Sequence, residues 1–177
     1  MLIVSIIMLA IVSVLAALSA RMAASAENVS GNVRLSALAM QAAEIALRHC
    51  ESSAAELIAL STGSTTDYPT LGFSDSNILP ASPAIWEIAS EWDSPTAPVY
   101  ILPLAQMNQP DLAATYQRPP ECMVGRVPFV LPSGAISTTA SFVVTARGFG
   151  PEVPAADPER HRPIGSEVWL QSHIKLQ

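Results

Sequence analysis

The sequence predicts an α+β protein in which one long N-terminal helix precedes a C-terminal antiparallel β-sheet. Two observations predict the helix: all fifteen prolines lie at Pro69 or beyond, and Gly31 is the only glycine among the first 62 residues. Proline removes a backbone donor and clashes with the preceding turn, so its absence leaves the helix propensity of Ala and Leu unopposed over residues 1 to about 61. A third observation predicts the sheet, because short β-like segments separated by turn residues fill the end of the chain.

The composition of the 177-residue chain narrows the class of protein. Half of the residues are hydrophobic and 14% are charged, which excludes a disordered or collagen-like chain. Nine Lys and Arg stand against fifteen Asp and Glu, for a formal net charge of -6. Because neutralising phosphates needs a surplus of cations, no nucleic-acid partner is expected.

Residues 1–20 form the first part of the predicted helix and are apolar on every side. They contain no charged residue, and Ser5, Ser13 and Ser19 are their only polar side chains. Such a length, at about 1.5 Å per residue, matches the roughly 30 Å hydrocarbon core of a bilayer. We therefore predict a segment that spans a membrane or is buried completely by other helices. The side chains expected to make these contacts are Leu2, Ile3, Ile6, Ile7, Leu9, Val12 and Leu15.

Residues 21–61 continue the helix but are amphipathic. Apolar residues recur largely at spacings of three and four with charged residues between them, which is typical of a helix that packs one stripe against a core. Glu44 and Arg48 stand four apart in the favourable order, so an exposed ion pair worth about 0.2–0.5 kcal/mol is expected. The whole helix would be roughly 90 Å long, far more than a bilayer core, so this second part needs another cover. The predicted stripe comprises Val29, Val33, Leu35, Leu38, Ala42, Ile45, Ala46, Leu57 and Ile58.

A globular head is expected to begin at residue 62 and to extend to residue 177. The run Ser61-Thr62-Gly63 ends the helix, and the Gly- and Pro-punctuated segment Gly63–Asn77 is predicted to be a loop. A short helix is expected over Pro83–Trp92, with Ser82 as its cap and proline at its first position.

Four later segments predict strands. The first two contain prolines, which cannot donate to a ladder, so these strands are expected to be edge-like, short or bulged. The expected sheet has three or four antiparallel strands. The segments are Val99–Leu104, Cys122–Leu131, Ser141–Arg147 and Ser166–Leu176.

The predicted sheet needs an apolar cover. The second half of the helix is the obvious candidate, since no other segment offers a comparable stripe. Alternation within Ser141–Arg147 and Ser166–Leu176 indicates that one face of these strands is exposed to solvent. Between them, Pro151–Pro163 is a proline-rich charged loop that is too polar to be buried.

Cys50 and Cys122 are the only cysteines. Two cysteines far apart behind a hydrophobic N-terminus indicate one disulfide formed in an oxidising, extracytoplasmic compartment. The alternative is a pair of free buried thiols. Because Cys50 falls on the helix and Cys122 opens a predicted strand, a bridge would fix the sheet to the helix, and loop-closure entropy gives it about 4–5 kcal/mol.

Three strings of residues resemble a known family. An apolar N-terminus that continues into a long helix with Asn-Val-Arg at residues 32–34 looks like a type IV pilin arm. The string at residues 41–48 (QAAEIALR) is similar to the PilX-type minor pilins, and so are the strand strings at residues 142–150 (FVVTARGFG) and 168–172 (VWLQS). The resemblance covers both ends of the chain and leaves residues from about 61 to 123 without a recognised motif.

The resemblance implies a type IV pilin fold and a role in assembly without catalysis. Residues 1–20 would anchor the chain in the inner membrane and then pack in the core of a filament, with the head in the periplasm or outside the cell. Minor pilins of this type prime pilus assembly from a tip complex. The implied partners are other minor pilins, the major pilin, a tip adhesin-like protein, the inner-membrane assembly platform, the prepilin peptidase and membrane lipid.

Two departures from the pilin pattern bear on this role. No basic leader ending in a small residue precedes the apolar run, so Met1 is either a processed N-terminus or a start placed within the gene. Most pilins also carry glutamate as the fifth mature residue, whereas Val4 and Ser5 occupy that place and the nearest acidic residue is Glu27. Losing this charge pair with a neighbour's amino terminus favours a first-in or tip position over that of a major subunit.

Three other functions compete with this interpretation. A secreted periplasmic binding module would use the small residues Ala24-Ser25-Ala26 for signal cleavage, although a basic n-region is missing. A minor pseudopilin of a type II secretion system is a further alternative. An enzyme finds little support, because His49, His161 and His173 are not spaced as a metal pair and no nucleotide or nucleophile motif is present. We expect no catalytic residue, metal or cofactor, and we expect His161 to lie in a solvated loop.

Overall fold

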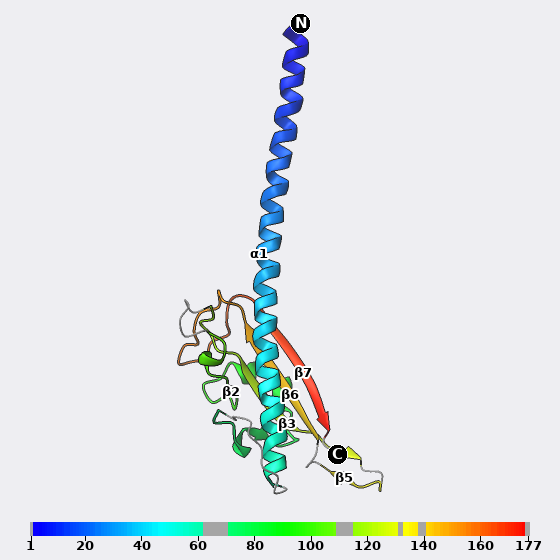
Figure 1. Cartoon of the computed structure of the whole chain (residues 1–177), viewed down its shortest axis with the longest axis vertical. Helices are drawn as coiled ribbons and strands as arrows, with labels where there is room; N and C mark the ends of the chain where they lie inside the picture. The colour runs from blue at the N-terminus through cyan, green and yellow to red at the C-terminus, as the bar shows by residue number, and fades with distance from the viewer. Residues whose placement is uncertain (1, 62–70, 109–114, 131–132, 138–140, 176–177) are drawn as a thin grey trace. The chain divides into compact units, whose positions relative to one another are not determined.

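The computed structural model describes residues 2–61, 71–108, 115–130, 133–137 and 141–175 (Figure 1). The chain divides into two units, Met1–Leu35 and Ser36–Gln177. Helix α1 (Leu2–Ser61) belongs to both units and ends where the sequence predicts. With the sheet described below, it makes the chain an α+β protein.

The first unit is the N-terminal part of α1. From Ile3 to Arg34 every side chain is exposed. The hydroxyls of Ser13 and Ser19 donate to the carbonyl oxygens of Leu9 and Leu15, at 2.7 and 2.9 Å. These two polar groups are therefore satisfied within the helix, as an apolar environment requires.

The second unit contains a five-stranded mixed sheet. Its order is β1-β3-β6-β7, and β2 also pairs with β3. The strands β2, β3, β6 and β7 pair antiparallel, as predicted, whereas β1 runs parallel to β3. The prediction of a purely antiparallel sheet of three or four strands was therefore right only in part. The strand bounds are β1 Ile78–Leu79, β2 Tyr100–Ile101, β3 Glu121–Arg126, β6 Ser141–Phe149 and β7 Glu167–Lys175.

The strands β1 and β2 are two short segments that share one edge of β3. Strand β2 pairs with Glu121 and Cys122, and β1 pairs with Val124 and Gly125. Each is two residues long, too short to show alternation, so β1 was not predicted and Val99–Leu104 was predicted too long. The chain leaves β2 at Pro103 and enters the 3-10 helix η3 (Leu104–Gln106).

The other predicted elements are divided in the structure. Segment Cys122–Leu131 breaks before Pro128 into β3 and β4 (Phe129–Val130), as the proline prediction allows, and β4 pairs with β5 (Ile136–Ser137). The expected helix over Pro83–Trp92 is instead η2 (Ile85–Glu87) followed by α2 (Ala89–Trp92), and Ala84 rather than Ser82 precedes η2. Within the predicted loop Gly63–Asn77, residues 63–70 lie outside the described residues and η1 (Asp75–Asn77) forms a further turn.

The helix covers one face of the sheet through small side chains. Ala46, Cys50 and Ala54 are buried in one core with Cys122, Val124, Phe142, Val144 and Ala146 of the strands, and Figure 1 shows this cyan part of α1 against β3 and β6. The predicted stripe was therefore only partly right. Of its members, Ala42 and Ala46 are buried, Leu35, Leu38, Ile45, Leu57 and Ile58 are half-buried, and Val29 and Val33 are exposed.

Gly148 explains why the buried helix face is made of alanine. A Cβ atom at this position of β6 would overlap the backbone of Ala39 and Ala43, which are both fully buried. Strand and helix backbones are thus in direct contact here, and larger side chains on either element would separate them.

Replacing Gly148 with alanine is therefore expected to lower the free energy of unfolding by about 1–3 kcal/mol, because the methyl group meets helix backbone that cannot rotate away. Urea unfolding of the full-length chain in detergent measures the change. Gly31→Ala is the matched control. Gly31 lies on α1, the helix that Gly148 contacts, and a Cβ atom there would have open space. Equal midpoints for Gly148→Ala and the wild type would contradict the close contact.

A second core covers the other face of the central strands. Trp86, Trp92 and Leu79 pack on Met123 and Val143, so β6 is buried along almost its whole length. The expected solvent-exposed face was therefore wrong for β6 and right for β7, whose side chains alternate between partly buried and exposed over most of the strand. The covering residues come from the middle of the chain, where no motif predicted them.

Candidate functional site

The predicted contact residues of the apolar helix are exposed in the first unit. Ile3, Ile6, Ile7, Leu9, Val12 and Leu15 are each more than half exposed, and the side chain of Leu2 lies outside the described residues. By length and composition this helix could cross a membrane. A signal sequence near an N-terminus has the same length and composition, so these two features do not distinguish the two roles. An apolar surface of this extent requires a cover, which lipid or other helices can provide.

The structure contains the disulfide between Cys50 and Cys122. It joins α1 to β3 in the middle of the helix-facing core, and both cysteines are fully buried. Because the two residues are 72 apart in the sequence, the bond closes a loop that includes η1, η2 and α2.

A buried ionic cluster lies at the end of the central strands. We define it as Asp93, Arg118, Glu121, Arg147, Arg160 and Glu167. Arg147 is its fully buried centre, with guanidinium nitrogens 2.7 Å from Asp93, 2.9 Å from Glu167 and 3.4 Å from Glu121. The same guanidinium stacks over the rings of Phe149 and Trp169, at 5.0 and 4.9 Å from their centroids. Three cations therefore face three carboxylates away from water.

Burial shifts the titration of two members of the ionic cluster. It raises the pKa of the Glu121 carboxyl, although Arg160, Arg147 and Arg118 oppose the shift by favouring the charged form. Burial also lowers the pKa of Arg118, whose guanidinium lies 4.6 Å from the centroid of the Phe149 ring. Desolvation is thus the largest influence on both groups, and the opposite charges offset part of it.

The ionic cluster was not predicted from the sequence. Alternation places Arg147 on the face of β6 opposite Ala146, but its partners Asp93 and Glu121 come from distant parts of the chain. The prediction that Pro151–Pro163 lies outside the core was wrong at two positions, because Val153 is fully buried and the Arg160 side chain is 12% exposed. The remaining charged residues of that loop are exposed.

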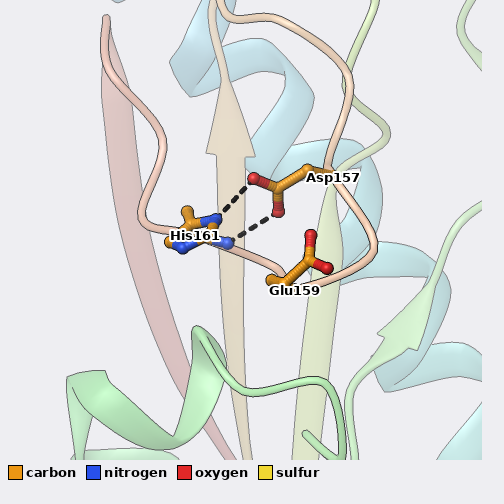
Figure 2. Close-up of side chains that lie close together, drawn as sticks. All are labelled: Asp157, Glu159 and His161. Atoms are coloured by element: carbon orange, nitrogen blue, oxygen red, sulfur yellow. Dashed lines mark hydrogen bonds and ion pairs between the residues drawn. The ribbon is translucent and has the colours of Figure 1, made fainter.

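The same loop brings three potential metal ligands together. Figure 2 shows Asp157 and His161 joined by two bonds, with Glu159 beside them, and their ligand atoms lie within 4.8 Å of one another. The His161 backbone N–H donates to Asp157 Oδ1 at 2.8 Å, and His161 Nδ1 lies 2.6 Å from Asp157 Oδ2. All three side chains are exposed, and the bond between the imidazole and the carboxylate already occupies two of the ligands.

The bond to Asp157 raises the pKa of His161 above its ordinary value of 6.5 and lowers the pKa of Asp157 below 3.8. Protonated His161 stabilises the turn fully below pH 6.5, and this stabilisation is lost as pH rises through its raised pKa. Ionised Asp157 stabilises the turn fully above pH 3.8, and this stabilisation is lost as pH falls through its lowered pKa.

We therefore expect Asp157→Asn to return the pKa of His161 toward 6.5, as measured by NMR titration of the imidazole. Glu159→Gln is the matched control, because Glu159 contributes least to the shift and its removal should lower the pKa less. Equal pKa values in the wild type and Asp157→Asn would show that the bond does not form in solution.

The other two histidines have different surroundings. His49 is buried on α1, where its ring stacks on Tyr100 with centroids 5.6 Å apart and its Nε2 lies 3.3 Å from the Tyr100 hydroxyl. A groove of about 610 Å³ borders it, lined by Gln41, Arg48 and Gln106 among others. In this region Arg48 pairs with Glu51 at 3.1 Å rather than with Glu44 as predicted. His173 lies on the exposed face of β7.

No protein-family model, curated protein or solved structure matches this chain. Its class is therefore defined by its own features. It is an α+β protein with an apolar N-terminal helix long enough to cross a membrane and a small disulfide-bonded head with a mixed sheet.

Proposed function

We propose that this chain is a minor pilin that primes type IV pilus assembly and occupies the tip complex or its neighbourhood, without catalysis. One observation carries the proposal. A single uninterrupted helix supplies an apolar, solvent-exposed first part and a small-residue face that packs on the sheet and is disulfide-bonded to it. The resemblance of residues 41–48, 142–150 and 168–172 to PilX-type minor pilins supports the same assignment.

The exposed helix suits a segment that exchanges one apolar cover for another. In the membrane, lipid would cover Ile3, Ile7 and Leu9; in a filament, the helices of other minor pilins and the major pilin would do so. The hydroxyls of Ser13 and Ser19 are satisfied by the helix itself, so neither cover has to supply a polar partner for them. The assembly platform and a tip adhesin-like protein would then meet the head, in the periplasm or outside the cell.

The charge distribution along α1 supports a tip position. Its first acidic residue is Glu27, so residues 1–20 offer no carboxylate to the amino terminus of a neighbouring helix. Residues 1–20 would therefore make no such ion pair within a filament, and a first subunit does not need one.

Intact mass and N-terminal sequencing test the proposal on protein from sheared surface filaments and from membranes of the native host. A methylated N-terminus at or next to Met1, found in the filament fraction, is the expected result. An N-terminus at Glu27 in soluble periplasm would instead identify a secreted module. Protein confined to the membrane and absent from surface filaments would indicate a pseudopilin.

Two variants of matched exposure test the helix itself. Leu9 and Val130 are 67% and 65% exposed, the first on α1 and the second on β4. We expect Leu9→Arg to deplete the chain from membrane and filament fractions, because arginine near the centre of a spanning helix costs about 2.5–3.5 kcal/mol. Val130→Arg should leave both fractions unchanged. Equal behaviour of the two variants would contradict a membrane or filament role for this helix.

A further inference from the structure

The loop between β6 and β7 is closed at its base by bonds that are independent of its middle. Gly150 N–H donates to the Ser166 carbonyl at 2.9 Å, and Ser166 N–H donates to the Glu152 carboxylate at 2.6 Å. Val153 adds a fully buried apolar contact. Beyond these residues, among positions 154–163, Arg160 and Pro163 are the only two that are not exposed.

Arg160 enters a site formed by two groups of the head. Its Nη2 donates to the Glu121 carboxylate at 2.5 Å and to the Trp92 carbonyl oxygen at 3.1 Å. The Glu121 side chain is 3% exposed, and the Arg147 guanidinium approaches it at 3.4 Å from β6. The site thus combines a buried carboxylate with a backbone acceptor, which suits a guanidinium donor.

Several features make this insertion releasable. Arg160 has a φ of 55°, a left-handed conformation that is unfavourable for a residue with a side chain. Both contacts use the same nitrogen, while Nε is buried without an acceptor among the residues that the structure describes. The turn that positions Arg160 is held locally, by its own N–H to the Asp157 carbonyl at 3.0 Å and by the bonds between Asp157 and His161.

We propose that Glu121 and the Trp92 carbonyl form a guanidinium-binding site, which Arg160 fills from within the chain and which an external guanidinium group can fill after displacing it. The loop 154–163 is then a strap closed by one arginine. Its opening frees the buried carboxylate of Glu121, which Arg160 pairs with in the closed strap. A partner segment that presents arginine is the occupant that this chemistry fits, since it would replace the contacts that Arg160 gives up.

Competition by an external guanidinium group is the release signal that this site chemistry provides. The groups that face Glu121 are Arg160 from the loop, Arg147 from β6 and Arg118 from the segment before β3. Burial raises the pKa of Glu121, and these three arginines oppose the shift. Arg160 itself favours the ionised carboxyl, so protonation of Glu121 would weaken its contact with Arg160.

Hydrogen exchange on the full-length chain in detergent tests the strap. Millimolar methylguanidinium is expected to accelerate exchange in residues 154–163 saturably, by about tenfold at saturation, because one charge-assisted bond to Glu121 is lost. Tetramethylammonium, which has the same charge and no N–H donor, should leave the loop unchanged, and β6 should remain protected with either salt. Equal effects of the two cations, or no acceleration, would overturn the proposal.

Variants test the site without relying on displacement. Arg160→Gln should accelerate exchange of the loop about tenfold, while Glu159→Gln, a loss of charge on an exposed neighbour, should not. Arg160→Gly should gain a saturable thermal stabilisation by methylguanidinium that the double variant Arg160→Gly with Glu121→Gln lacks. Unchanged exchange in Arg160→Gln would show that Arg160 does not hold the strap, and an equal response of the single and double variants would remove Glu121 from the site.

Discussion

Replacing Arg147 with methionine is expected to lower the free energy of unfolding by about 3–5 kcal/mol. Methionine keeps much of the aliphatic length but removes every donor. The carboxylates of Asp93 and Glu167, paired at 2.7 and 2.9 Å, would then face a buried site without this cation, and Glu121 would keep only its other arginines. Because Arg147 favours the ionised form of Glu121, the pKa of that carboxyl should also rise further.

Urea unfolding of the full-length chain in detergent measures the loss. Arg48→Met is the matched control, since the Arg48 side chain is 80% exposed and pairs only at the surface, with Glu51. Exposed pairs of this kind contribute about 0–1 kcal/mol. If both variants unfold at the wild-type midpoint, then Arg147 is either solvated in the folded protein or easily replaced by apolar packing.

The elements that the sequence predicts well are those set by local composition. Helix α1 ends at Ser61, within the run Ser61-Thr62-Gly63 where the sequence predicts its end. The segment before this run contains no proline, which allows one continuous helix. Strands β6 and β7 lie at the predicted positions, because nine residues are enough for alternation and β-branched content to be visible. Short β1 and β2 have no such signal, since they exist only through pairing with β3.

The buried face of the helix shows why hydrophobic periodicity misses a close contact. Periodicity gives weight to large aliphatic residues, and it selected Val29 and Val33, which are exposed. The close contact with the sheet instead uses Ala39 and Ala43, which the predicted stripe omitted, because Gly148 brings the two backbones together. Only the joint occurrence of alanines on the helix and a glycine on a distant strand indicates this packing.

The ionic cluster depends on residues that are distant in sequence. Asp93, Arg118 and Glu121 come from the middle of the chain, Arg147 and Glu167 from the last two strands, and Arg160 from a loop. Each residue is unremarkable in its local pattern, and an isolated arginine at the end of a strand is usually solvated. The cover that buries them is tertiary, so sequence alone predicts their charges and not their burial.

Removing the disulfide is the other change with a large expected effect. The double variant Cys50→Ala with Cys122→Ala should lose about 4 kcal/mol of the free energy of unfolding. The bond joins residues 72 apart, and without it the unfolded chain regains the conformational entropy that this closed loop removes. Alanine is the suitable replacement, since both sites are fully buried and serine would place hydroxyls among Ala46, Ala54 and Val144. Denaturant unfolding with and without a reducing agent measures the loss.

Two comparisons separate this entropy from damage to the core. Reduced wild-type protein should unfold close to the midpoint of the double variant, because each retains the same helix and sheet surfaces and differs only by two small sulfur groups. Hydrogen exchange in residues 36–61 should rise more than exchange in β6 and β7, since the bond joins α1 to β3 and the strands keep their ladder. If the reduced protein and the double variant are both as stable as the oxidised wild type, then the packing of alanines against Gly148 holds the helix without the bond, and the disulfide must act on something other than the stability of the head.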